Sequence, residues 1–176
     1  MSSGPGCFLL PSIVVAASTL TAAPAAPADV SGLIDIDGGR RMYLECRGTG
    51  APTVVLIAGL KASADDWTSA ERTAPTVYSG VADVTRVCAY DRPGTPVGEK
   101  PSRSDPVRQP TTAAEAVVDL HALLRASHER APFVLVGHSY GGLIANLYAR
   151  TSPKEVAGLV LVDALSEGLQ EAETPD

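Results

Sequence analysis

The sequence predicts an α/β protein in which a mostly parallel β-sheet is covered by helices on both faces. Short apolar runs rich in β-branched residues alternate with segments of helical periodicity along most of the chain. Residues 53–58 (T-V-V-L-I-A) are apolar almost without interruption, as expected of a strand buried on both faces of a parallel sheet. Strands that alternate with helices favour this layered architecture over an all-β or all-α one.

Composition and charge limit the classes of protein to which the chain can belong. The chain has 176 residues, of which 45% are apolar and 19% charged, as expected of one globular domain. The net charge of -6 leaves no basic stripe for a phosphate backbone, so we expect no nucleic-acid partner. Neither G-x-G-x-x-G after the first long strand nor G-x-x-x-x-G-K-[ST] occurs, so we expect no nucleotide cofactor, and we assign no metal site.

The first 28 residues differ from the rest because they contain no Asp, Glu, Lys or Arg. Residues 8–20 form an apolar run, and Ala26-Pro27-Ala28 fits the small-x-small pattern of a signal-peptidase site. We therefore interpret residues 1–28 as a signal peptide and 29–176 as the domain, which predicts a secreted or extracytoplasmic protein. The alternative is an unstructured tail or misassigned start on a cytoplasmic protein. The run is shorter than the roughly 18 residues of a membrane span, so we expect no stable membrane insertion.

The first half of the domain begins with a predicted hairpin. Residues 33–36 and 42–46 flank Asp37-Gly38-Gly39, which suits a turn with positive φ. The elements expected next are a strand at 53–58, a helix from 66 to about 77, a strand at 85–90 and a surface loop at 95–110, rich in Pro, Ser and Arg.

The second half alternates helix and strand. Thr112 and Glu115 have capping-box spacing, and apolar residues then recur at helical intervals to about residue 126. Residues 133–136 predict a buried strand. A helix with an apolar face over 143–148 and a stop near Pro153 follows, before a last strand at 157–162.

The segment between the 133–136 strand and the next helix contains Gly137, Ser139 and Gly141, which match G-x-S-x-G. The strand-to-helix context is the one in which this motif forces a serine into strained backbone angles and lifts its hydroxyl above the sheet. The helix also directs its positive end toward the serine, where an anion is stabilised. The alternative is a glycine-rich turn with an incidental serine.

At these residues the chain resembles the α/β-hydrolase superfamily, in its serine esterase and lipase branch. The resemblance rests on V-L-I-A-G-L (55–60), A-Y-D-R-P-G (89–94), V-G-H-S-Y-G-G (136–142) and L-V-L-V-D (159–163). It implies that Ser139 is the nucleophile and that the backbone N–H groups of Leu60 and Tyr140 form an oxyanion hole.

The resemblance also implies the strand order 1-2-4-3-5-6, which makes the second and fourth strands neighbours. Cys46 and Cys88 would then lie side by side, which favours a disulfide over two buried thiols.

Four aspartates are candidates for catalytic, capping or other structural roles. In relatives the D-R-x-G segment is a structural turn, so we assign Asp91 a structural role rather than a catalytic one. Asp65 and Asp66 are expected as helix N-caps. Asp163, at the end of the last strand, is a candidate triad acid, with a structural turn as the alternative.

A serine nucleophile needs a base, and none of the three histidines fits. His138 adjoins the serine with its side chain directed elsewhere, His128 precedes the 133–136 strand, and His121 lies mid-helix. The superfamily carries its histidine after further strands, so we expect a form truncated before that histidine, lacking the C-terminal strands and cap.

The sequence therefore predicts part of a serine hydrolase that acts on a small acyl substrate through an acyl-enzyme, with little activity in this form. The exposed edge of the sixth strand favours aggregation. The alternatives are a non-catalytic ligand-binding module and a non-functional fragment. Sequence alone fixes neither the substrate nor the oligomeric state.

Overall fold

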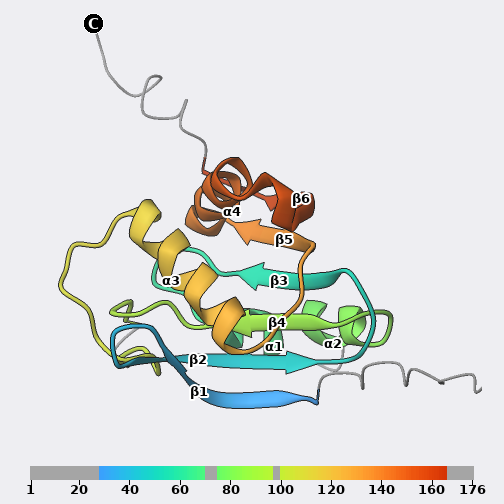
Figure 1. Cartoon of the computed structure of the whole chain (residues 1–176), viewed down its shortest axis with the longest axis horizontal. Coiled ribbons are helices and arrows are strands. Elements are labelled where there is room, and N and C mark those ends of the chain that lie inside the picture. The colour runs from blue at the N-terminus through green and yellow to red at the C-terminus, as the bar shows by residue number, and fades with distance from the viewer. Residues whose placement is uncertain (1–27, 70–74, 97–99, 166–176) are drawn as a thin grey trace, which may run out of the picture.

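The computed structural model describes residues 28–69, 75–96 and 100–165 (Figure 1). Its centre is a six-stranded sheet of order β1-β2-β4-β3-β5-β6, as predicted. The strands are β1 (Val30–Ile36), β2 (Arg40–Arg47), β3 (Thr53–Ile57), β4 (Val87–Tyr90), β5 (Phe133–His138) and β6 (Val156–Val162). The helices are α1 (Asp65–Thr68), α2 (Val77–Ala82), α3 (Ala113–Ala126) and α4 (Tyr140–Thr151), with a 3-10 turn at Pro153–Glu155. The predicted signal peptide, residues 1–28, lies outside the described residues except for Ala28.

The sheet is antiparallel at one end and parallel through its middle. β1 pairs with β2 and β2 with β4 in antiparallel fashion, whereas β4, β3, β5 and β6 run parallel. The β1–β2 turn contains Gly38 and Gly39 at φ +80° and +70°, a region that favours glycine. This confirms the predicted hairpin.

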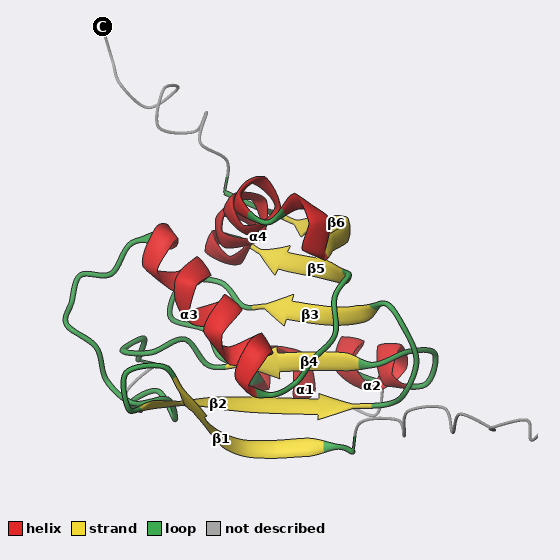
Figure 2. Ribbon diagram, in the orientation of Figure 1, coloured by secondary structure: helices red, strands yellow, loops and turns green. Residues whose placement is uncertain are grey.

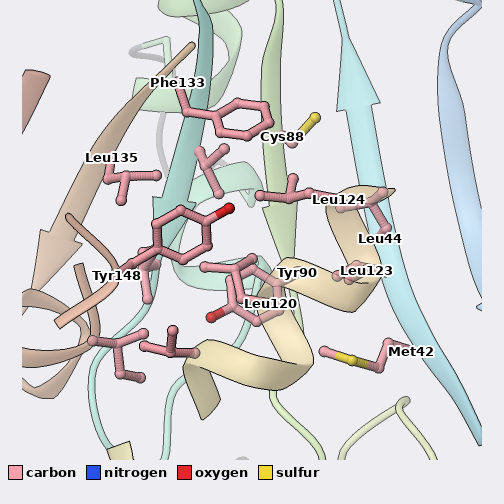
Figure 3. Packing of buried hydrophobic residues seen from close by; sticks show 14 of the residues in the cluster. Met42, Leu44, Cys88, Tyr90, Leu120, Leu123, Leu124, Phe133, Leu135 and Tyr148 are labelled. Carbon is pink, nitrogen blue, oxygen red and sulfur yellow. The ribbon is translucent and has the colours of Figure 1, made fainter. Parts of the chain in front are cut away.

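Helices cover both faces, as predicted, with α3 and α4 on one side and α1 and α2 on the other (Figure 2). Side-chain alternation along β3 explains the two layers. Val55 and Ile57 join the core beneath α3 and α4, and Val54 and Leu56 join the core that contains Trp67. Figure 3 shows the first core, which packs these labelled residues: Met42, Leu44, Cys88, Tyr90, Leu120, Leu123, Leu124, Phe133, Leu135 and Tyr148.

The capping box of α3 is confirmed. The Thr112 hydroxyl accepts from the N–H of Glu115 at 3.2 Å, and the Glu115 carboxylate accepts from the N–H of Thr112 at 2.7 Å. Arg40 at the hairpin turn pairs with Asp119 on α3. The cap and the ion pair fix where α3 begins and how it crosses the sheet. In the described part of the chain, no helix combines the length and apolar character that a bilayer span requires.

The prediction of one helix from 66 to about 77 is wrong. Ser69 is extended, with ψ 121°, and ends α1 after one turn, whereas Thr76 is extended, with ψ 163°, and starts α2. The Thr76 hydroxyl accepts from the N–H of Ser79 at 3.0 Å, so it caps a separate helix.

The N-cap roles expected for Asp65 and Asp66 are also wrong, because the N-cap of α1 is Ala64. Asp66 lies in the first turn and its carboxylate accepts from the N–H of Ser63 at 2.8 Å. Asp65 pairs with Arg103 at 2.9 Å. Both acids therefore stabilise the start of α1 from inside the helix.

β6 forms one edge of the sheet and pairs with β5 alone among the described strands. Its large side chains alternate between two faces, and both faces are open. The exposed fractions are Leu159 37%, Val160 48%, Leu161 48% and Val162 41%. No charged residue interrupts the strand, so β6 lacks the side chains that usually protect an edge from pairing with another chain.

Cys46 and Cys88 face each other across β2 and β4 and are joined by a disulfide. Beside the bond lies a buried ion pair, in which the Arg86 guanidinium donates to Glu129 at 2.7 Å and 2.9 Å. Both side chains are 1% exposed. The disulfide and the ion pair together tie β2 and β4 to the connection between α3 and β5.

We expect reduction of the disulfide to destabilise the fold by about 4 kcal/mol. The bond closes a loop with a sequence separation of 42 residues, and opening a loop of that size restores this much entropy to the unfolded chain. Urea unfolding with and without a thiol reductant measures the difference. The C46A/C88A variant is the control, because its unfolding midpoint should match that of the reduced protein and ignore the reductant. Equal midpoints for oxidised and reduced wild type would contradict the assignment.

Candidate active site

Ser139 occupies a one-residue corner between β5 and α4, as the motif predicts. Its backbone has φ +50° and ψ −121°, a strained conformation for a residue other than glycine. The strain costs about 1–3 kcal/mol. Three backbone hydrogen bonds offset it at about 1 kcal/mol each. The Ser139 N–H donates to Val162 at 3.1 Å, and the Ser139 carbonyl accepts from Gly142 at 2.9 Å and Leu165 at 3.0 Å.

The motif glycines lie where backbones pass at close range. A Cβ on Gly137 would lie 2.5 Å from the carbonyl oxygen of Gly141 at the start of α4. A Cβ on Gly141 would overlap the carbonyl oxygen of Ile57 at the end of β3. β3, β5 and α4 can therefore meet at one point only because these side chains are absent.

The loop after β3 lies directly against the serine. A Cβ built on Gly59 would lie 3.3 Å from the Cβ of Ser139 and 3.0 Å from Nδ1 of His138. Leu60 follows at once, with its side chain 65% exposed. Tyr140 supplies the first N–H of α4, which has no partner within the helix.

Among the residues that the structure describes, the N–H groups of Leu60 and Tyr140 donate no hydrogen bond to the protein. The structure thus brings together three of the four predicted site residues: Ser139, Leu60 and Tyr140. Two free amides beside a hydroxyl at the positive end of a helix can stabilise negative charge on an adjacent oxygen.

A cavity of about 260 Å³ adjoins this corner. Leu60 and Tyr140 line it together with the 93–96 and 109–111 loops and the first half of α3. Its two acids already have partners, because Glu115 belongs to the α3 capping box and Asp119 pairs with Arg40. Its lining also includes two cations, Lys61 and Arg92, beside Pro93, Pro96 and Ala116.

Asp163, the fourth predicted site residue, lies at the end of β6 with φ +43° and is exposed. It immediately follows Val162, whose carbonyl accepts from Ser139. Within the described ranges, its carboxylate forms no hydrogen bond. Asp163 is therefore near the corner along the sheet edge, and its role as triad acid stays a prediction.

None of the three histidines forms a hydrogen bond with the Ser139 hydroxyl in the described structure. His121 Nε2 contacts Glu155 at 3.2 Å, and Glu155 also accepts from Tyr148 at 2.7 Å. The pKa of the Glu155 carboxyl is lowered mainly by the hydrogen bond from the Tyr148 hydroxyl, and to a smaller extent by the contact with His121. His128 lies before β5, at the opposite end of the strand from Ser139.

His138 is exposed beside Gly59. Nor does Tyr90, at the end of β4, offer a base, since burial raises its pKa to about 12 and keeps the phenol neutral.

Asp91 has the structural role that the sequence analysis assigned. It is 2% exposed, and its carboxylate accepts from the N–H of Ala64 at 2.9 Å and from Arg103 at 2.6 Å. The neighbouring Arg92 was missed. It is buried and donates to the backbone carbonyls of Ala58 and Gly59 in the loop that faces Ser139. Its place directly after a strand end was the available signal.

The described residues contain one group of possible metal ligands, namely Cys46, Cys88 and Glu129. The two sulfurs are bonded to each other and the carboxylate is held by Arg86, so we assign no metal there. The expectation that the site uses neither metal nor cofactor stays a prediction.

Comparison with known proteins agrees with this geometry. The alpha/beta hydrolase fold family matches residues 52–175. An abhydrolase domain-containing protein of Caenorhabditis elegans, abhd-5.2, is 34% identical over 110 residues, which cover 62% of this chain and 22% of the worm protein. An uncharacterised protein of Schizosaccharomyces pombe is 30% identical over 149 residues, covering 73% of this chain and 27% of the yeast protein.

Among solved structures, a thermophilic esterase from Thermogutta terrifontis is 26% identical with a TM-score of 0.62, and the match covers 82% of this chain and 50% of the esterase. The chain thus spans about a quarter of these two relatives and half of the esterase. The match over residues 52–175, the six-stranded order and the serine corner agree, and the chain belongs to the alpha/beta hydrolase fold family.

Proposed function

We propose that this chain is the nucleophile-bearing part of a serine hydrolase that cleaves an ester, thioester or amide through an acyl-enzyme on Ser139. The observation that carries the proposal is the strained corner, which presents the Ser139 hydroxyl beside the free N–H groups of Leu60 and Tyr140. A serine in an unstrained turn without nearby donors would have no such use.

The reaction follows from that arrangement. Ser139 Oγ attacks the acyl carbon as a base takes its proton, and the carbonyl π electrons move onto oxygen. The oxyanion accepts from Leu60 and Tyr140. Its collapse expels the leaving group, which takes the proton from the base. Water then attacks the acyl-enzyme in the same sequence and releases Ser139.

The base is the component that the described residues do not supply. His121 and His128 lie away from the corner, and His138 contacts the Gly59 side of it. Asp163 at the end of β6 is the proposed acid that would orient a histidine. We therefore expect slow turnover by the chain alone, from substrate binding and oxyanion stabilisation.

An ester is the favoured substrate class. Two of the similar solved structures are described as a thermophilic esterase and a putative lipase, at 26% and 25% identity. The cavity beside Leu60 and Tyr140 is small, at about 260 Å³, which fits a short acyl group.

Ser139 should be labelled by a fluorophosphonate probe, and S139A should abolish the labelling, because phosphonylation needs the same oxygen and the same two amide donors. Mass spectrometry of the labelled peptide identifies the residue. S127A is the matched control, since Ser127 lies at the end of α3 and bonds to Leu123, and it should label as wild type does.

Imidazole tests the missing base in the same proteins. Added imidazole should raise the rate at which wild type hydrolyses p-nitrophenyl butyrate several-fold, because a diffusible base replaces the absent side chain. The rate with S139A and imidazole is the background and should stay well below it. Ligand binding in the cavity with neither labelling nor rescue would favour a non-catalytic binding module instead.

We also propose that the protein is exported. The Cys46–Cys88 disulfide supports this, because such bonds persist in oxidising compartments. Expression of the whole chain in a secreting cell should give a mature N-terminus at Asp29, measured by intact mass. The A28R variant should keep its leader, since the site requires a small residue before the cut. An intact, cytoplasmic wild-type chain would contradict export.

The β6 edge supports a further proposal, that the isolated chain self-associates through it. V160K should lower the weight-average mass measured by sedimentation at high concentration, because a charge on an edge strand opposes pairing. V84K is the control, since Val84 is 80% exposed and lies in the turn after α2. An equal effect of both variants would assign the change to net charge rather than to β6.

A further inference from the structure

Arg92 contacts both elements that carry the proposed amide donors. Its guanidinium donates through one terminal nitrogen to the carbonyl of Ala58 and through the other to the carbonyl of Gly59. Its Cζ lies 5.6 Å from the centre of the Tyr140 ring. The side chain is 6% exposed, and no carboxylate pairs with it in the part of the chain that the structure describes.

The contact with Gly59 determines where the Leu60 N–H points. The peptide between Gly59 and Leu60 is trans, and in a planar trans peptide the C=O and N–H groups point in opposite directions. The Gly59 carbonyl accepts from Arg92 and also, at 3.4 Å, from the N–H of Ala62, so the Leu60 N–H is directed to the other side. Rotation of this peptide would turn the donor away.

Asp91 fixes the other end of the same loop. Its carboxylate accepts from the N–H of Ala64, while Arg92 takes the carbonyls at the loop's start. Two consecutive residues after β4 therefore clamp the connection from β3 to α1 from both ends. The two clamps differ in consequence, because Arg92, unlike Asp91, bonds to the peptide that contains the Leu60 N–H.

A lysine cannot replace this arginine. The guanidinium reaches two carbonyls at once through a rigid planar fork, and its Cζ lies 5.6 Å from the centre of the Tyr140 ring. An ammonium group is a compact point donor without that fork. R92K therefore keeps the charge while it removes the simultaneous hold on Ala58 and Gly59.

We infer that Arg92 is a positioning residue that aims the Leu60 amide at the acyl oxygen bound to Ser139. This inference rests on the proposed function. It assigns to Arg92 an effect on the chemical step rather than on substrate binding, because this amide acts on charge that develops only after Ser139 attacks.

Saturation kinetics of fluorophosphonate labelling test the inference. R92K should lower the limiting labelling rate by roughly tenfold or more, because a misdirected oxyanion donor acts like a missing one. The half-saturating probe concentration should stay within about twofold. R103K is the matched control, since Arg103 holds Asp91 but touches neither Ala58 nor Gly59, and its limiting rate should stay within about twofold of wild type.

An equal loss in R92K and R103K, or a loss confined to half-saturation, would overturn the inference. Backbone amide NMR separates its failure from failure of the proposed function. If wild type is never labelled, the hydrolase proposal fails, yet R92K should still shift the Gly59 and Leu60 amide resonances relative to R103K. If the Gly59 and Leu60 resonances are unchanged in R92K, the positioning role is wrong whatever the labelling shows. Well-dispersed resonances from the rest of the chain would show that R92K is folded.

Discussion

The close passage of three backbones at one point is the constraint on which the rest of the structure depends. The end of β3, the end of β5 and the start of α4 approach so closely that Gly137 and Gly141 have no room for a side chain. This crowding leaves Ser139 a single residue in which to reverse direction, and hence its positive φ. The strained corner is therefore a product of packing, and hydrogen bonds to β6 and α4 retain it.

The same crowding sets the position of the loop after β3. Gly59 fits beside Ser139 because it too lacks a side chain, and Arg92 donates to its carbonyl. The proposed site thus draws on three parallel strand ends, with a hydroxyl from β5, one amide from the β3 loop, a second from α4 and an anchoring guanidinium from β4. Each group occupies the carboxyl edge of the sheet, where α/β proteins commonly place their ligands.

Short sequence patterns predicted the features that depend on interactions between residues close together in the chain. The hairpin glycines, the Thr112 capping box and the Ser139 corner follow from residues a few positions apart, and the structure contains all three. The helix expected from 66 to about 77 was mispredicted because this stretch carries no strong helical period. Contacts with distant residues also act on it, since Asp65 at its start pairs with Arg103 from a later loop.

Arg92 was missed for the same reason. Its partners lie 33 and 34 residues away in sequence, and backbone carbonyls leave no mark on a pattern of side chains. The strand order and the Cys46–Cys88 disulfide were predicted from the resemblance to the α/β-hydrolase superfamily, because the periodicity of a sequence does not show which strands are neighbours. The roles of Asp163 and of the absent base depend on groups that the described residues do not bring to Ser139.

The disulfide closes a covalent ring within the chain. The ring closed by Cys46 and Cys88 encloses β3, α1 and α2, so Leu60 belongs to a cyclised segment, while Ser139 lies outside it on the open chain. A single backbone cut inside the ring would leave both products tethered through sulfur. The two proposed amide donors therefore lie one inside this ring and one outside it, and non-covalent packing sets their relative position.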